Sequence, residues 1–194
     1  MTREFRWRIL SLQAMLVLVL AFGSYFAFWA NGFSTGMVRD QLVAQQIFFP
    51  AKDQVKAGGA LDPAEFPQEI RDQAGNQVTT GDQARIYAMD FIGIHLTKVA
   101  NGKTFSQIDT KTGDAATIAK ATAQKSTLFQ GEMLKGSLLN AYAWWTMGVY
   151  AGYAAWALLI ATIAVLGALV FELLVAPRVE KVKVVPTLKG AQVA

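Results

Sequence analysis

The feature that most constrains this chain is a pair of long apolar segments separated by residues 31–142. Residues 9–30, ILSLQAMLVLVLAFGSYFAFWA, contain no charged residue. At about 1.5 Å per residue, a helix of this length crosses a hydrocarbon core about 30 Å thick. Residues 143–176 are longer than a crossing requires, so we expect this helix to tilt or to begin outside the membrane. The sequence therefore predicts two transmembrane helices, over residues 9–30 and 143–176.

The charges that flank these segments predict their orientation. Residues 31–142 hold 11 Lys or Arg against 11 acidic residues, so the excess of basic charge behind the formal net charge of +4 sits in the two tails, residues 1–8 and 177–194. Cytoplasmic loops carry an excess of Lys and Arg, which predicts that both tails are cytoplasmic and that residues 31–142 are extracytoplasmic. Aromatic residues mark the outer end of both segments: Tyr25, Phe26, Phe28 and Trp29 in the first, and Tyr142, Trp144 and Trp145 in the second.

A cleaved signal peptide is the alternative interpretation of residues 9–30. Such a peptide has a shorter apolar run and small residues just before the cleavage site. Here the run is long and large aromatic residues crowd the region around Ala30, so we expect the helix to be retained. The predicted location is the cell membrane, with two passes.

Residues 31–142 predict a mostly helical domain whose first and last helices extend the membrane helices. Helical composition continues to Phe49, and Pro50 predicts the end of the first helix. Prolines and glycines in residues 50–81 predict an irregular loop, with a helical turn at residues 63–71. The predicted fold class is therefore an all-α membrane protein with a helical extracytoplasmic domain.

The second half of this domain predicts two further helices. The first runs over residues 80–99 and ends at a left-handed Asn101-Gly102 stop. Its predicted packed face comprises Ala84, Tyr87, Ala88, Phe91, His95 and Val99. Asp114 is a predicted cap for a last helix that runs into the second membrane segment. Within that helix, either Gly131 or Gly136 is expected to mark a break or a close crossing.

The composition argues against several kinds of chemistry. Without cysteine the chain has no disulfide, thiolate metal site or iron–sulfur cluster, and a single histidine cannot form a bis-His haem or a multi-His zinc site. The carboxylates are spaced like ordinary helix starts and loop charges, without a calcium-loop, G-x-S-x-G or Gly-rich phosphate motif. We therefore predict a non-enzymatic protein with no catalytic residue, metal or cofactor. Because the excess basic charge sits in the tails, we expect contact with lipid headgroups and not with nucleic acid.

Two ionisable residues are the weak candidates for a polar site. His95 lies between Phe91 and Val99 on the predicted helix, which favours a packed structural role over a ligand or general base. Glu172 is the one ionisable residue within the predicted spans, and an intramembrane acid is a candidate proton or cation site. Its position near Arg178 at headgroup depth favours snorkelling or local pairing.

Small residues on the second span predict a helix-packing interface. Alanines recur at alternating spacings of three and four, and a G-x-x-x-G pair lies on an adjacent face: Ala154, Ala157, Ala161, Ala164 and Ala168, with Gly148 and Gly152. Small residues at this spacing let another membrane helix approach closely. The alternatives are that the stripe receives the first span of the same chain, or that it docks a neighbouring subunit.

Three runs carry a family resemblance: YAMDFIGIHL at residues 87–96, GKTFSQ at residues 102–107 and LFQGEMLKGSLLNAY at residues 128–142. Over residues 87–145 the chain resembles a group of two-pass membrane proteins of high-GC Gram-positive (actinobacterial) bacteria. Some members carry a ring-opening dioxygenase label, but one histidine cannot build the non-haem iron triad that this chemistry needs. The resemblance implies no site residues.

These observations favour an accessory or scaffolding subunit of a larger membrane complex, packing through the second span and the extracytoplasmic domain. Its expected partners are the lipid bilayer and other membrane subunits, in a hetero-complex or a homo-oligomer. A ligand-sensing ectodomain anchored by two helices is the first alternative. An auxiliary of a membrane enzyme, with His95 as a polar site, is the second.

Overall fold

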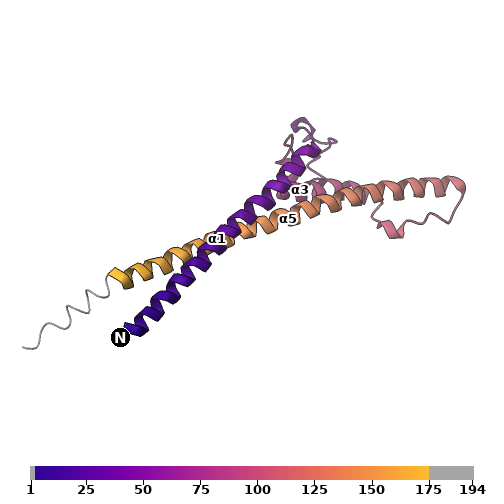
Figure 1. The fold of residues 1–194 in the computed structure, drawn as a ribbon. Helices are drawn as coiled ribbons and strands as arrows, with labels where there is room; N and C mark the ends of the chain where they lie inside the picture. Colours follow the sequence, from indigo (N-terminus) through magenta and orange to yellow (C-terminus); the bar gives the residue numbers. More distant parts are fainter. Residues whose placement is uncertain (1–2, 175–194) are drawn as a thin grey trace, which may run out of the picture. The chain divides into compact units, whose positions relative to one another are not determined.

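A computed structural model of the chain describes residues 3–174 (Figure 1). The predicted tail at residues 177–194, with Arg178, and the last two residues of the predicted second span lie outside the described residues. Two long helices dominate what is described: α1 (Arg3–Gln45) and α5 (Ala115–Leu174). Between them lie six short helical elements: η1 (Lys52–Gln54), α2 (Gln68–Arg71), α3 (Gly81–Ile86), η2 (Tyr87–Gly93), α4 (Ile94–Val99) and η3 (Phe105–Gln107).

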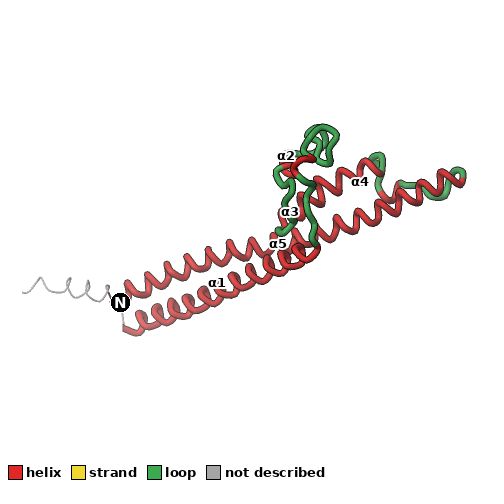
Figure 2. The backbone as a smooth tube through the Cα atoms, turned by 90° about the horizontal axis from the view of Figure 1, so that it is seen from above, coloured by secondary structure: helices red, strands yellow, loops and turns green. Residues whose placement is uncertain are grey.

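The described residues are mostly helical and contain no strand, which confirms that part of the predicted fold class (Figure 2). An isolated bridge between Phe48 and Gln77 is the one β-type pairing among them. The described chain forms two compact units. The first comprises residues up to Ala30 together with those from Tyr150 onward, and the second comprises Asn31–Val149.

The first unit is a pair of antiparallel helical segments. The hydroxyl of Ser24 donates to the main-chain carbonyl of Ala155 at 3.0 Å, and the Arg6 guanidinium donates to the carbonyl of Glu172 at 2.6 Å. Both α1 and α5 contain stretches long and apolar enough to cross a membrane, and these stretches are only 11% and 6% buried within the chain. The core helix of a soluble protein would be mostly buried, whereas these segments leave most of their apolar side chains uncovered by the described chain.

The second unit has a single apolar core, built from the end of α1, the loop region with α2, the helical run that begins at Gly81, and α5. The fully buried side chains of largest volume are Leu61, Ile70, Val38 and Val78, from the loop region, α2 and the end of α1. The helical run over residues 81–100 adds a line of buried residues, and α5 adds Leu128 and Leu138. Packing of this kind stabilises the unit by about 25 cal/mol for each Å² of apolar surface removed from water.

The end of α1 differs from the predicted boundary. The helix ends at Gln45, because Gln46 adopts a left-handed conformation with φ of 51°. The extended chain that follows pairs with residues 76–78: the amide of Phe49 donates to the carbonyl of Asn76 at 2.9 Å. Pro50 therefore lies beyond the helix and does not end it.

Two predicted helix boundaries are confirmed. Asn101 and Gly102 have φ of 50° and 75°, the left-handed stop expected after α4. The carboxylate of Asp114 accepts the amide of Thr117 at 2.8 Å and caps α5. The predicted helix over residues 80–99 also forms, beginning at a capping box in which the amide of Gln83 donates to the Thr80 hydroxyl at 3.2 Å.

The packed face of that helix was predicted only in part. One line of buried residues recurs at every fourth position, namely Ala84, Ala88, Ile92, Leu96 and Ala100, and Ile86 is buried beside it. His95 and Val99 are exposed, whereas Tyr87 and Phe91 are half-buried. The reason is that η2 is a π-helix, in which each carbonyl accepts from the amide five residues ahead. A π-helical turn holds more residues than the 3.6 of an α-helical turn, so residues spaced four apart stay on the same side of the helix.

Glycines mark two close crossings in the second unit. A Cβ atom added at Gly81 would overlap the side chain of Trp145, and one added at Gly131 would overlap Leu96. Gly136 has open space around it, and α5 passes both Gly131 and Gly136 without a break. The expectation of a close crossing is confirmed for Gly131.

Candidate functional site

Within the first unit, α5 presents distinct faces because successive residues of a helix are rotated by about 100°. One face meets α1: Ala155 and Thr162 are 0% and 8% exposed, and Leu158, Val165 and Leu169 on the same side are half-buried. A second face carries large exposed side chains, including Trp156, Ile160 and Ile163. The predicted small-residue stripe lies between them.

The stripe is mostly free of the chain's own contacts. Ala154, Ala157, Ala164 and Ala168 are exposed, and Ala161 is half-buried. The face of α5 that meets α1 contains the residues one position after Ala154 and Ala157 of the stripe. Ser24 and Gly23 of α1 approach Ala155 and Leu158 on that face. Small side chains on the open face form a shallow surface on which a further helix can lie closely.

The two glycines of the predicted interface have different surroundings. Gly148 belongs to the second unit. A Cβ atom added to it would lie 2.9 Å from Cγ2 of Thr35 and 3.0 Å from Cβ of Ser34. Asn31 donates to the carbonyl of Gly148 at 2.8 Å, and Ser34 donates to that of Trp144 at 2.6 Å. Gly148 therefore serves close packing between α1 and α5. Gly152, in the first unit, is half-buried.

His95 is an exposed residue with a defined local partner. Its Nδ1 lies 2.8 Å from the main-chain oxygen of Phe91, and its ring lies 4.5 Å from the Phe91 ring and 5.5 Å from that of Phe66. Because one ring nitrogen and one ring face are engaged within the helix, this geometry suits a residue that secures the end of the π-helical segment.

Glu172 is half-buried near the end of α5, and its main-chain oxygen is the acceptor for Arg6. A cation at this position stabilises the carbonyl end of a helix, since the last four carbonyls have no partner within the helix. The residue predicted to pair with Glu172, Arg178, lies outside the described residues.

Several carboxylates of the second unit hold local structure in place. Asp62 accepts the amides of Gly58 and Ala64 at 2.7 and 2.9 Å, and these two hydrogen bonds hold its pKa below the usual range. Glu65 pairs with Lys98 and Glu69 pairs with Arg85. Across residues 3–174, no three His, Asp or Glu side chains gather closely enough to hold a metal ion.

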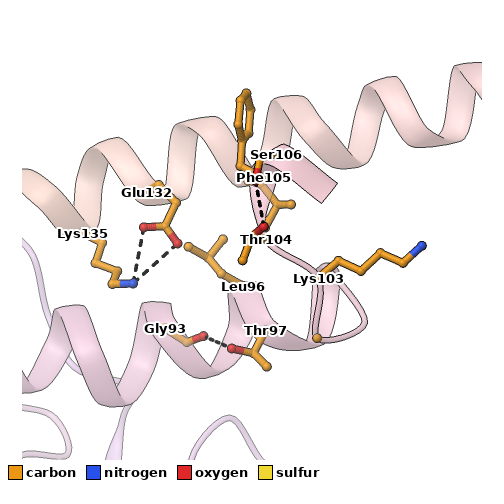
Figure 3. A pocket seen from close by; sticks show the side chains of 11 residues that line it. Gly93, Leu96, Thr97, Lys103, Thr104, Phe105, Ser106, Glu132 and Lys135 are labelled. Carbon is orange, nitrogen blue, oxygen red and sulfur yellow. Dashed lines mark hydrogen bonds and ion pairs between the residues drawn. The ribbon is translucent and has the colours of Figure 1, made fainter. Parts of the chain in front are cut away.

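A cleft of about 480 Å³ in the second unit was not predicted from the sequence (Figure 3). Its walls come from three segments: Gly93, Leu96 and Thr97 of the η2–α4 run, residues 102–106 of the connector, and Leu128, Glu132 and Lys135 of α5. The volume lies within the range of small-molecule sites. The lining residues of the cleft are far apart in the sequence. Gly102, in the predicted left-handed stop, is the lining residue that the sequence analysis had singled out by a local pattern.

The floor and the rim of the cleft differ in chemistry. Leu96 and Leu128 are 7% and 3% exposed and form an apolar floor. Lys135 pairs with Glu132 at 3.3 Å on one side, and the hydroxyls of Thr104 and Ser106 lie 3.0 Å apart on the other. Lys103 also lines the rim, with its ammonium directed away from Lys135 (Figure 3). The charged lining residues therefore carry one net positive charge.

Comparisons with known proteins return no relative for this chain. No family model matches it, and neither a curated protein nor a solved structure is detectably similar to it.

Proposed function

We propose that the chain is a non-catalytic accessory or scaffolding subunit of a membrane complex, docking a neighbouring subunit through the small-residue stripe of α5. In this proposal α1 and α5 cross the cell membrane, both ends of the chain are cytoplasmic, and residues 31–142 are extracytoplasmic. The observation that carries it is that α1 packs against the Ala155 face, so Ala154, Ala157, Ala164 and Ala168 are left exposed.

Two further features support a docking role. In lipid, helices associate through close van der Waals packing, which small residues permit and large ones prevent. The part of the second unit that lies outside the proposed spans also exposes large apolar side chains, among them Phe129 at 56% and Met133 at 58% on one side of α5. Exposed apolar residues that gather on a folded domain are typical of protein-binding surfaces.

The absence of cysteine makes this proposal directly testable. Ala157→Cys places a single thiol on the stripe, and Ile160→Cys places one on the exposed large-residue face as a matched control. Each variant is labelled in native membranes with a thiol-reactive photocrosslinker, and the products are analysed by mass spectrometry. We expect one defined adduct with a membrane protein from Ala157→Cys only. Equal labelling of neighbours by both variants, with migration of the gently solubilised protein as a lone chain, would overturn the proposal.

The cleft favours a second candidate function, a ligand-binding extracytoplasmic domain. A pocket with an apolar floor and a few polar groups on its rim is the usual form of a small-molecule site. The ligand class is argued below, since it depends on the charges of the rim.

A further inference from the structure

We propose that the cleft between α4, the connector at residues 102–106 and α5 binds a small organic anion with an apolar body, such as an aromatic or short-chain carboxylate. This site is separate from the α5 stripe, which lies in the other unit. The argument rests on the shape of the cleft, the contacts that hold its walls and the charges on its rim.

The walls of the cleft are held in place by contacts of their own. The left-handed Asn101 and Gly102 turn the chain back toward α5, and the amide of Thr104 donates to the side chain of Gln107 at 2.8 Å. The connector is tied to α5 where Lys125 donates to the carbonyl of Ile108 at 3.3 Å. Binding therefore requires little ordering of the protein, and the free-energy cost of ordering side chains and loops on binding is small at this site.

The close crossing of α4 and α5 determines the depth of the cleft. Gly131 allows the Leu96 side chain to reach the surface of α5, and Leu96 and Leu128 then form the apolar floor. A ring or short alkyl chain resting there removes apolar surface from water, worth about 25 cal/mol for each Å². The ring of Phe105, 42% exposed, belongs to the lining at the edge of the cleft and lies 6.2 Å from the ring of Phe129.

The rim selects an anion. Lys135 directs its ammonium into the space between α5 and α4 (Figure 3), and its side chain is 23% exposed. Its partner Glu132 is 51% exposed, so water competes for this pair and a ligand carboxylate can replace Glu132 as the acceptor. Of the hydroxyls of Thr104 and Ser106, only one donates to the other, which leaves one proton for the ligand.

The charge of the rim also separates this ligand class from a zwitterion such as an amino acid. A monoanion is attracted by Lys135 and Lys103 and repelled by Glu132. A zwitterion would place its ammonium on Glu132 and its carboxylate on Lys135. Glu132→Gln therefore has opposite effects on the two classes: it tightens binding of an anion and weakens binding of a zwitterion.

The test uses the full chain in nanodiscs of zwitterionic lipid, with benzoate as the probe and benzyl alcohol as its neutral counterpart. Binding is measured by saturation-transfer NMR, with empty nanodiscs as the blank. We expect benzoate to bind more tightly than benzyl alcohol and its affinity to fall as salt is added. Lys135→Gln should weaken benzoate binding by about tenfold, the usual size of a charged hydrogen bond.

Lys120→Gln is the matched control, because Lys120 is an exposed lysine of α5 outside the cleft. It should leave benzoate affinity unchanged, and Glu132→Gln should increase it. Near-UV circular dichroism of each variant checks the fold, and Lys103→Gln is a second, exposed variant expected to weaken binding less than Lys135→Gln. Equal binding of benzoate and benzyl alcohol, no benzoate binding at millimolar concentration, or an equal loss in Lys120→Gln would each overturn the proposal. Photocrosslinking through Ala157→Cys should be the same in the Lys135→Gln background, so the two proposals can fail separately.

Discussion

The hydroxyl of Ser24 donates to the main-chain carbonyl of Ala155 at 3.0 Å, where Ser24 is 3% exposed and Ala155 is fully buried. The contact requires a small residue at position 155, since a longer side chain would separate the two backbones. It thereby identifies which side of α5 meets α1 in the first unit. Residues one position away along the sequence, such as Ala154, lie on a different side of the helix.

Ala155→Leu is predicted to weaken the pairing of α1 with α5. Overpacking of a close contact costs about 1–3 kcal/mol, and the larger side chain would also break the Ser24 hydrogen bond. Thermal unfolding of the detergent-solubilised protein measures the loss. Ala154→Leu, the same change on the exposed stripe, is the control and should leave the unfolding temperature of the isolated chain unchanged. Equal losses in both variants would contradict the assignment of the two faces.

Three glycine substitutions should separate close crossings from open helix surface. Gly81→Ala is predicted to destabilise the protein by about 1–3 kcal/mol, because the added methyl group would overlap the Cβ and Cγ atoms of Trp145. Gly131→Ala should cost less, since a leucine side chain can shift more easily than the base of a tryptophan. Gly136→Ala has open space and should stabilise the helix by about 1 kcal/mol. Chemical denaturation of the three variants measures the order.

Asp90 is predicted to make stability depend on pH. Partial burial raises its pKa, with a further contribution from Glu69, while Arg85 acts in the opposite direction. Because the folded pKa is raised, the stabilising contribution is full below the unfolded pKa of about 4 and is lost as pH rises through the folded value. Asp90→Asn should therefore raise the melting temperature at neutral pH. A gain that persists undiminished below pH 4 would contradict this account.

Asp114 should show the opposite dependence at the start of α5. Hydrogen bonds from the hydroxyl and amide of Thr117 lower its pKa, so its contribution is present at neutral pH and is lost as pH falls below about 4. Asp114→Ala is predicted to speed hydrogen exchange of the amides in residues 116–120 at neutral pH. Asp114→Asn keeps an acceptor and should preserve the protection while removing its pH dependence. Unchanged exchange in Asp114→Ala would show that the cap is dispensable.

The long helices and their ends were accessible to sequence reasoning because the signals are local. An uninterrupted apolar run, an aspartate cap and an Asn-Gly stop each determine the backbone within a few residues. The turn of η2 was not accessible in this way, and regular α-helical spacing therefore placed His95 and Val99 on the packed face. Their exposure follows from the π-helical turn of η2, which the sequence pattern does not encode.

The faces of α5 and the cleft illustrate the same limit. Position 154 and position 155 are both alanine, so spacing alone could not tell which line receives α1. The hydrogen bond from Ser24 distinguishes them only in three dimensions. The cleft needs Leu96, Lys103 and Lys135 to meet from three segments, and this depends on the crossing at Gly131.

The wide turn at residues 87–93 also has a consequence for how this chain can change in length. Gly81 and Leu96 each contact α5, and the π-helical segment between them holds more residues than a regular α-helix of the same turns. Deletion of one residue inside the segment would let it relax to a regular α-helix between the same two contacts. Deletion on either side of it would rotate one contact away from α5 by about 100°. Homologous chains that are one residue shorter between Gly81 and Leu96 should therefore lack that residue within residues 87–93.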